Sequence, residues 1–287
     1  MQPDPVHTSK WGLILRVGVF AFLEIAGLNV FATLLMPVGG YLVAAALGTF
    51  AAAAVANAVA VRIWERGRLS DIGLGWNQAS RHNLGVGAAA GVCAALLVVG
   101  LPLLTGAARI EWEAAPSFHW PTFFFVSLVL LFGAVGEEML FRGYGFQVLV
   151  NALGPYATIL PVSIVFGFAH AANSHATGLG IFNTVAWGVI FGVAFLRSGD
   201  LWLPIGLHFG WNWTLPVFGA NLSGFKMVAG GYAMRWSAGP LWSGGEYGPE
   251  AGLLTSLVVI PLMVFLFRGP VRRQRAWLLR DLQGGES

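Results

Sequence analysis

The composition of this 287-residue chain is that of an integral membrane protein. Hydrophobic residues make up 56% of it and charged residues only 10%, against about 25% charged residues in a soluble domain, and the mean hydropathy is +0.71. The net charge is +3, and the basic residues flank apolar segments, so lipid headgroups rather than nucleic acid are the expected partner. The lone cysteine, Cys93, excludes a disulfide framework. The composition therefore excludes an ordinary soluble enzyme.

Apolar stretches long enough to cross a bilayer recur along the chain. Two of them, residues 42–61 and 84–104, contain no charged residue and match the ~20 residues that a transmembrane helix needs. The predicted spans are 17–36, 42–61, 84–104, 121–150, 155–175, 178–196, 201–219 and 251–268. The first has no small-residue cleavage site after it, so we expect it to be retained. The sequence predicts an all-α bundle of eight transmembrane helices in one integral membrane domain, residues 1–287.

Basic residues fall mostly on one side of such an eight-span chain. That side carries Lys10, Arg62, Arg66, Arg68, Arg81, Arg197, Arg268, Arg272, Arg273, Arg275 and Arg280, and the other carries Arg109, Lys226 and Arg235. By the positive-inside rule we expect cytoplasmic termini, with the loops around 105–120 and 220–250 facing outward. The composition favours a multi-pass protein of a bacterial inner membrane. The basic stretch 271–283 is predicted to lie on the inner surface as an amphipathic helix.

Pairs of glycines four residues apart occur in three of the predicted spans. These pairs are Gly87/Gly91, Gly188/Gly192 and Gly206/Gly210. Glycines at this spacing let two helix backbones approach closely in lipid. We therefore expect close helix packing at these positions, and no chemistry.

Two acids and an arginine lie inside the fourth predicted span, in the stretch GAVGEEMLFRGY. Each ionised side chain costs ~2.5–3.5 kcal/mol in hydrocarbon. Glu138 and Arg142 are four residues apart on one helical face, so they can form an ion pair. A structural ion pair explains these two residues but leaves Glu137, about 100° around the helix, without a partner. Glu137 therefore needs a different explanation.

Two later spans carry a histidine paired with another residue at helical spacing. Phe166 and His170 lie four residues apart in the fifth span, and His208 and Asn212 do so in the seventh. The fourth and fifth spans are predicted to form a hairpin near residue 153, which puts Glu137 and His170 at about the same depth. His208 lies only ~12 Å into its helix, whereas Glu137 is ~24 Å from its turn. Their meeting requires a tilted helix, or a fourth helix that extends beyond the bilayer.

Two acids, two histidines and an asparagine on three spans predict a buried hydrophilic chamber. A carboxylate among apolar helices is suited to take a proton from water near neutral pH, which makes Glu137 the candidate general base. His170 is predicted to help hold that water, directly or through a metal. His208 and Asn212 are predicted to donate hydrogen bonds to the oxyanion formed from an amide. Together these roles describe hydrolysis of a peptide bond.

The blocks EExxxR, FxxxH and HxxxN, at 137–142, 166–170 and 208–212, resemble the signature of the CAAX-processing and bacteriocin-immunity family of intramembrane endopeptidases, which includes the type 2 CAAX prenyl proteases. The motifs cover about residues 120–215, the expected catalytic core. The resemblance implies an eight-helix membrane protease whose cavity opens toward the membrane or the cytoplasm. The implied catalytic residues are Glu137, His170, His208 and Asn212, and the implied supporting residues are Glu138, Arg142 and Phe166.

The resemblance leaves the cofactor and the substrate open. Family members are often classed as metalloproteases, yet these blocks lack HExxH, and a carboxylate-activated water needs no metal in principle. If the site takes a divalent ion such as Zn²⁺, the predicted ligands are Glu137, His170 and His208. The implied substrate is a membrane-associated peptide or protein. Relatives act on prenylated CAAX proteins, or are linked to peptide maturation, bacteriocin immunity and regulation of membrane proteins.

Two other functional classes fit a polar cluster inside a helical bundle. A transporter also places Glu, His and Arg there, but the first half of the chain has no matching motif, which argues against an inverted-repeat transporter. A non-catalytic scaffold or immunity protein of the same fold would bind a partner through its helices. The scaffold interpretation predicts that Glu137→Gln leaves the biological phenotype intact, whereas the protease interpretation predicts its loss.

Overall fold

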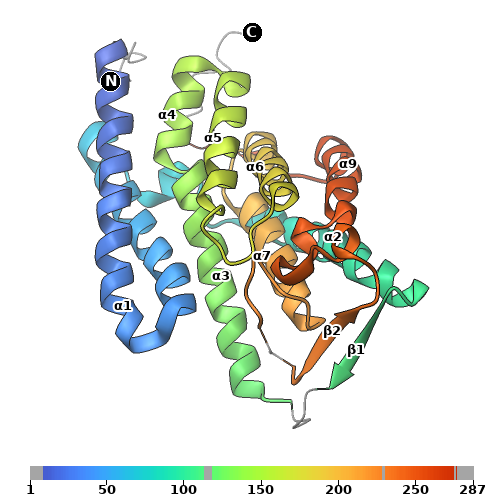
Figure 1. The fold of residues 1–287 in the computed structure, drawn as a ribbon. Coiled ribbons are helices and arrows are strands. Elements are labelled where there is room, and N and C mark those ends of the chain that lie inside the picture. The colour runs from blue at the N-terminus through green and yellow to red at the C-terminus, as the bar shows by residue number, and fades with distance from the viewer. Residues whose placement is uncertain (1–8, 113–117, 228–229, 275, 277–287) are drawn as a thin grey trace.

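The computed structural model describes residues 9–112, 118–227, 230–274 and 276, and over these residues the chain is a bundle of helices with one small sheet (Figure 1). The helices are α1 (Lys10–Ala60), α2 (Gln78–Thr105), α3 (Trp120–Arg142), α4 (Tyr144–Leu153), α5 (Pro155–Ala169), α6 (Gly178–Ser198), α7 (Trp202–Val217), α8 (Pro240–Ser243) and α9 (Leu253–Arg268). Single turns of other helix types are η1 (Val61–Glu65), η2 (Leu69–Ile72), η3 (Gly245–Tyr247) and η4 (Pro249–Ala251). The predicted all-α membrane bundle is confirmed.

The first two predicted spans are the two arms of α1. Gly40 has φ 68° and ψ −171°, outside the helical region, so the chain reverses there and residues 10–39 run antiparallel to residues 41–60 (Figure 1). The arms pack closely, because a Cβ built on Gly27 would lie 3.0 Å from the Cβ of Ala52. A glycine at the turn accepts the positive φ without strain.

Each remaining predicted span has a helical counterpart, but the helices differ in length. Residues Trp120–Leu153, which form α3 and α4, cover 34 residues, or ~51 Å, against a ~30 Å hydrocarbon core. The fourth predicted helix is thus long enough to extend beyond the bilayer. Four described helices are long and apolar enough to cross a membrane, while α5 and α9 are apolar but shorter. Helix α5 ends at Ala169, before the predicted limit of 175.

Helices α2 and α7 pack at backbone contact through four glycines. A Cβ built on Gly87 or Gly91 of α2, or on Gly206 or Gly210 of α7, would overlap a carbonyl oxygen of the other helix. Only glycine permits this approach, which places the two predicted pairs face to face. The third pair, on α6, packs against α5. The predicted packing role of all three pairs is confirmed, and the α2 contact sets the position of α7.

Two loops predicted to share one side of the membrane pair as a sheet. Strand β1 (Ala108–Trp112) runs antiparallel to β2 (Tyr232–Trp236), with Ala108 opposite Trp236. The sheet lies at the end of the bundle opposite the start of α1 (Figure 1). The sequence did not predict these strands, because each spans only five residues. Their pairing shows that the two loops lie at the same end of the molecule.

A buried polar network closes the other end of the bundle. The carboxylate of Asp200, between α6 and α7, accepts hydrogen bonds from Asn83 at 2.8 Å, from Gln274 at 2.5 Å and from the Leu203 amide at 3.2 Å. The side chain of Asn83 also bonds the backbone of Arg272. Residues 271–274 are therefore held in non-helical form, which contradicts the predicted surface helix there. Of the rest of that prediction, residues 275 and 277–283 lie outside the described residues.

Candidate active site

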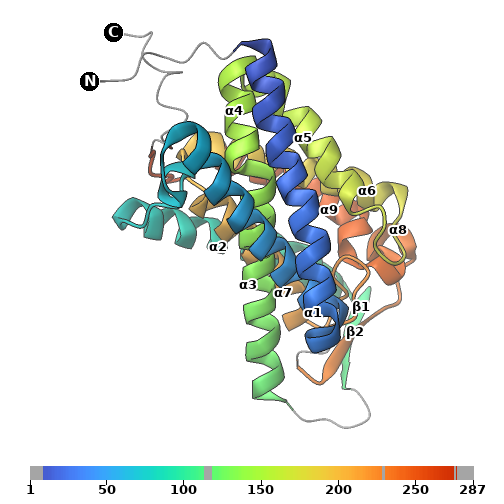
Figure 2. The same cartoon turned by 90° about the vertical axis from the view of Figure 1, so that its left-hand side faces the viewer.

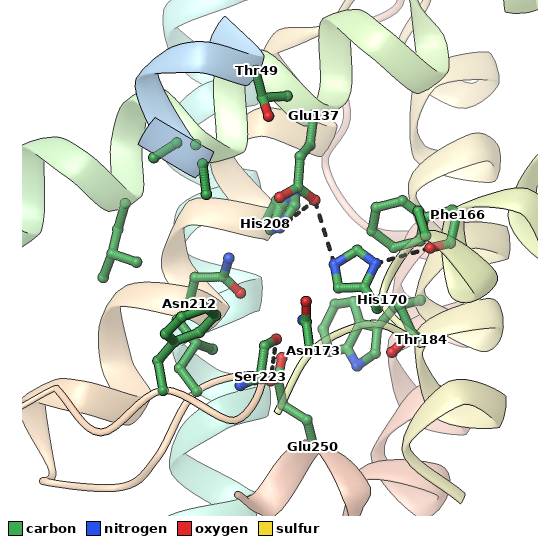
Figure 3. Close-up of a pocket in the computed structure, with 18 of the residues that line it drawn as sticks. Thr49, Glu137, Phe166, His170, Asn173, Thr184, His208, Asn212, Ser223 and Glu250 are labelled. Carbon is green, nitrogen blue, oxygen red and sulfur yellow. Dashed lines mark hydrogen bonds and ion pairs between the residues drawn. The ribbon is translucent and has the colours of Figure 1, made fainter. Parts of the chain in front are cut away.

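Residues of all three blocks line one pocket of about 300 Å³. The pocket lies between α1, α3, α5, α6 and α7, and its lining continues into residues 222–227 and Glu250 beyond α7. Block residues in the lining are Glu137, Phe166, His170, His208 and Asn212. Figure 3 shows both histidines beside the same oxygen of the Glu137 carboxylate. The structure therefore brings together the residues that the sequence predicts for a hydrophilic chamber.

The carboxylate of Glu137 faces both histidines. Its Oε2 atom lies 3.8 Å from Nε2 of His170 and 3.9 Å from Nε2 of His208. This oxygen is buried and has no hydrogen-bond partner among the described residues. Helices α3 and α5 thus place Glu137 and His170 at one level, as the hairpin predicts. A buried carboxylate oxygen without a donor needs one from outside the chain.

His208 is oriented by the second acid of the first block. Its Nδ1 lies 2.8 Å from Oε1 of Glu138, and Glu138 forms the predicted ion pair with Arg142 at 3.4 Å. In this arrangement His208 Nδ1–H donates and the Glu138 carboxylate accepts. The imidazole also stacks on Phe191, with ring centroids 4.7 Å apart. Glu138 and Arg142 are fully buried behind the pocket, so they position His208 rather than line the chamber.

His170 is oriented by its own helix. Its Nδ1 donates a hydrogen bond to the carbonyl oxygen of Phe166 at 2.8 Å, since a carbonyl can only accept. The ring of Phe166 lies edge-on to the imidazole, with centroids 4.8 Å apart. The same ring has the guanidinium of Arg142 4.8 Å above its centre. Phe166 therefore links the histidine of the second block to the arginine of the first.

These orientations determine which atoms face the pocket. When each histidine is neutral and donates through Nδ1, its Nε2 carries a lone pair. The lone pairs of His170 and His208 then point toward the Glu137 carboxylate. Three acceptors facing one another repel unless a donor lies between them. A water molecule, with two O–H donors, can bond two of these three acceptors.

The predicted metal ligands do not fit a metal ion in this arrangement. Within the described ranges, no group of three or more His, Cys, Asp or Glu side chains could hold one, and this includes Glu137, His170 and His208. Both imidazole nitrogens approach the same carboxylate oxygen at 3.8–3.9 Å.

Asn212 lies one helical turn beyond His208 and lines the same pocket (Figure 3). Both residues face the chamber because Gly206 and Gly210, on the same helix, turn toward α2. The close α2 contact thus sets the rotation of α7. The meeting of His208 with Glu137 is consistent with the long α3–α4 segment, although the two residues differ in depth along their helices.

The sequence did not predict the end of the pocket that Ser223 and Glu250 line. The carboxylate of Glu250, in η4, accepts hydrogen bonds from Trp211 Nε1 at 3.1 Å and from the amide and hydroxyl of Ser223 at 2.6 and 2.7 Å. Asn173, which follows α5, also lines the pocket. Glu250 lies in a Gly- and Pro-rich loop, where an acid is ordinarily solvated, so nothing in its surrounding sequence marks it strongly as a pocket residue.

Residues 119–214 match the family described as type II CAAX prenyl endopeptidase Rce1-like. The matched segment begins at α3, ends within α7 and contains all three blocks. No curated protein matches the chain. The predicted family resemblance is confirmed over this segment, and it supports CAAX-type intramembrane protease activity in general.

Proposed function

We propose that the chain is an intramembrane endopeptidase in which Glu137 activates a water molecule to hydrolyse a peptide bond of a membrane-associated substrate. One observation carries the proposal: a buried oxygen of Glu137 has no donor among the described residues and faces Nε2 of both histidines at 3.8 and 3.9 Å. This arrangement suits a water held beside a general base. The family match over residues 119–214 supports the same class of activity.

The reaction follows from the positions of these side chains. The water donates one hydrogen to Glu137 and one to His170, and its oxygen attacks the carbonyl carbon while the first proton passes to Glu137. The oxyanion that forms accepts a hydrogen bond from the amide of Asn212. In the form of the enzyme that carries a proton on both nitrogens of His208 before the attack, Nε2–H donates a second bond and keeps its proton throughout, and the Glu138 carboxylate at Nδ1 stabilises that imidazolium. Glu137 then gives its proton to the leaving nitrogen, which leaves a new carboxyl terminus and a new amine.

The proposed location is a bacterial inner membrane with both termini in the cytoplasm. The positive-inside pattern supports it, and so does the pairing of β1 with β2, the two loops that this topology puts outside. The end of the pocket lined by Ser223 and Glu250 then faces away from the cytoplasm. A membrane-impermeant thiol reagent applied to intact cells tests this in a Cys93→Ser background. Labelling of Glu246→Cys without labelling of Arg81→Cys is expected, and the reverse result would overturn the topology.

Peptide hydrolysis by the purified protein in detergent tests the proposed activity. We expect the wild type to cleave a quenched-fluorescence prenylated CAAX peptide or a membrane-anchored peptide without a prenyl group. Glu137→Gln and His208→Ala are expected to abolish this cleavage, whereas Glu246→Gln, a charge change at an exposed loop residue, is expected to preserve it. Cleavage in the presence of a chelator would show that side chains and water carry out the reaction. Loss of cleavage in the chelator, restored by adding Zn²⁺, would show that a metal is required.

Two outcomes would contradict the proposal. Equal cleavage by the wild type and by folded Glu137→Gln would remove Glu137 from the reaction. The non-catalytic scaffold would be favoured by two results together. Folded wild-type protein would cleave neither class of peptide, and a strain carrying Glu137→Gln would keep its phenotype.

A further inference from the structure

The pocket has a carboxylate at each end and no described lysine or arginine in its lining. Its described lining includes the carboxylates of Glu137 and Glu250 but no lysine or arginine. In Figure 3, Glu137 lies at one end of the pocket and Glu250 at the other, with His170 and Asn173 between them. Glu250 also lies outside the family match, which ends at residue 214. This second acid therefore belongs to a part of the pocket that the catalytic motifs do not define.

Glu250 is held in place but is not neutralised. Its three hydrogen bonds come from the uncharged donors of Trp211 and Ser223. No ion pair joins it to a described residue. A carboxylate has about four acceptor positions, so one remains for a donor in the pocket. The bonds to Trp211 on α7 and to Ser223 in the loop keep this charge at a defined position.

The charge of Glu250 acts on its surroundings. Tyr247 lies in the neighbouring turn η3 and is 2% exposed. Burial, and then the negative charge of Glu250, raise the pKa of the Tyr247 hydroxyl to about 12. The same negative charge lines the pocket. It would attract a cation placed in the pocket and repel an anion.

Resting on the proposed protease function, the geometry points to Glu250 as a specificity-determining residue that receives a lysine or arginine side chain of the substrate. A long basic side chain can bring its apolar stem along the apolar pocket walls while its charged end reaches Glu250. A free terminal carboxylate in the same pocket would meet the like charges of Glu137 and Glu250 and no described lysine or arginine. The pocket therefore selects a basic segment of a peptide over an acidic one.

A set of matched peptides tests the assignment. One cleavable parent sequence carries Lys, norleucine or Glu in turn at each position on both sides of the scissile bond. At the position that reaches Glu250, the wild type should have a kcat/KM for Lys about tenfold above that for norleucine, with Glu lowest. The difference should lie mainly in KM. Glu250→Gln should bring the Lys and norleucine values to within about twofold.

Two variants separate the charge of Glu250 from its structural role. Ser223→Ala removes one hydrogen bond to Glu250 but keeps its charge, so the Lys preference should persist even if the loop is less stable. Glu246→Gln removes a nearby exposed charge outside the lining, and it should leave the preference unchanged. A preference lost equally in Ser223→Ala and Glu250→Gln would show that Glu250 only supports the loop, and would overturn the proposal.

A binding measurement keeps this test independent of catalysis. Fluorescence anisotropy of the same peptides with Glu137→Gln protein in proteoliposomes should give tighter binding of the Lys peptide than of the norleucine peptide. The double variant Glu137→Gln/Glu250→Gln should lose that difference. If no peptide is cleaved but this difference is found, the protease function fails and the assignment of Glu250 stands. Equal binding of the Lys and norleucine peptides would overturn it.

Discussion

Two polar clusters along α7, one just before its first residue and one around its middle, differ in how their acids are satisfied. The carboxylate of Asp200 has hydrogen bonds to both oxygens from Asn83, Gln274 and the Leu203 amide. In the pocket, by contrast, Oε2 of Glu137 has no hydrogen-bond donor among the described residues. Asp200 is 2% exposed, whereas the Glu137 side chain is 28% exposed although its Oε2 atom is buried, so the two acids differ in burial as well as in bonding.

The difference indicates which cluster serves stability and which serves chemistry. An acid whose bonds are complete within the chain stabilises the fold, and removing it leaves its donors unpaired. An acid that lacks a donor gains nothing from the fold and is available to a water or a substrate. We therefore expect substitutions at the two clusters to have opposite effects on activity and on stability.

Replacing Glu137 should give the largest effect on activity. Glu137→Gln removes the proposed general base and should lower kcat by about 10³-fold. The thermal midpoint should not fall, because no hydrogen bond to the buried oxygen is lost. Peptide hydrolysis and thermal unfolding in the same detergent measure both quantities. A lower thermal midpoint with a proportionate loss of activity would instead show that Glu137 stabilises the fold.

Replacing Asn212 should give the next largest effect. Asn212→Ala removes a proposed donor to the oxyanion, so kcat should fall about 10²-fold while KM changes little. Steady-state kinetics with one cleavable peptide separate the two constants. An increase in KM alone would make Asn212 a substrate-binding residue, with no role in the transition state.

Replacing Asp200 should affect stability instead. Asp200→Ala leaves the buried donors of Asn83 and Gln274 without their acceptor, so the protein should lose about 2 kcal/mol of stability. Urea or thermal unfolding measures this loss. The activity of the remaining folded fraction should stay within about twofold of the wild type. A much larger loss of activity in fully folded Asp200→Ala protein would show that this cluster also affects the pocket.

The pH dependence of the Asp200 cluster should give the smallest effect. Burial raises the pKa of Asp200, and its hydrogen bonds oppose the rise without cancelling it. The folded protein then holds this proton more tightly than the unfolded chain, so stability falls as pH rises from the ordinary aspartate range through the folded pKa, and is level above it. Asp200→Asn should remove this slope, a change of less than about 4 °C in thermal midpoint between pH 4 and 7. If stability depends on pH in Asp200→Asn as it does in the wild type, another titrating group causes the dependence.

The sequence by itself determined the membrane bundle and the three motif blocks. Runs of about 20 uncharged residues require helices in lipid, because each backbone group must find its hydrogen bond within the segment. The predicted break before Pro155 ends α4 and starts α5, which brings Glu137 level with His170. The spacing of Glu138 and Arg142 gave their ion pair. Each of these features depends only on the order and spacing of residues along one helix or one turn.

Only the tertiary structure decided the partners that lie far apart in the chain. Nothing in the local sequence shows that Glu138 orients His208, which is 70 residues away; the backbone contact of α2 with α7 sets that alignment. The same holds for the pairing of β1 with β2 and for Glu250, which reaches the pocket through Trp211 and Ser223. Such contacts depend on how helices tilt and rotate against one another, and the residue spacing along a single helix does not determine this.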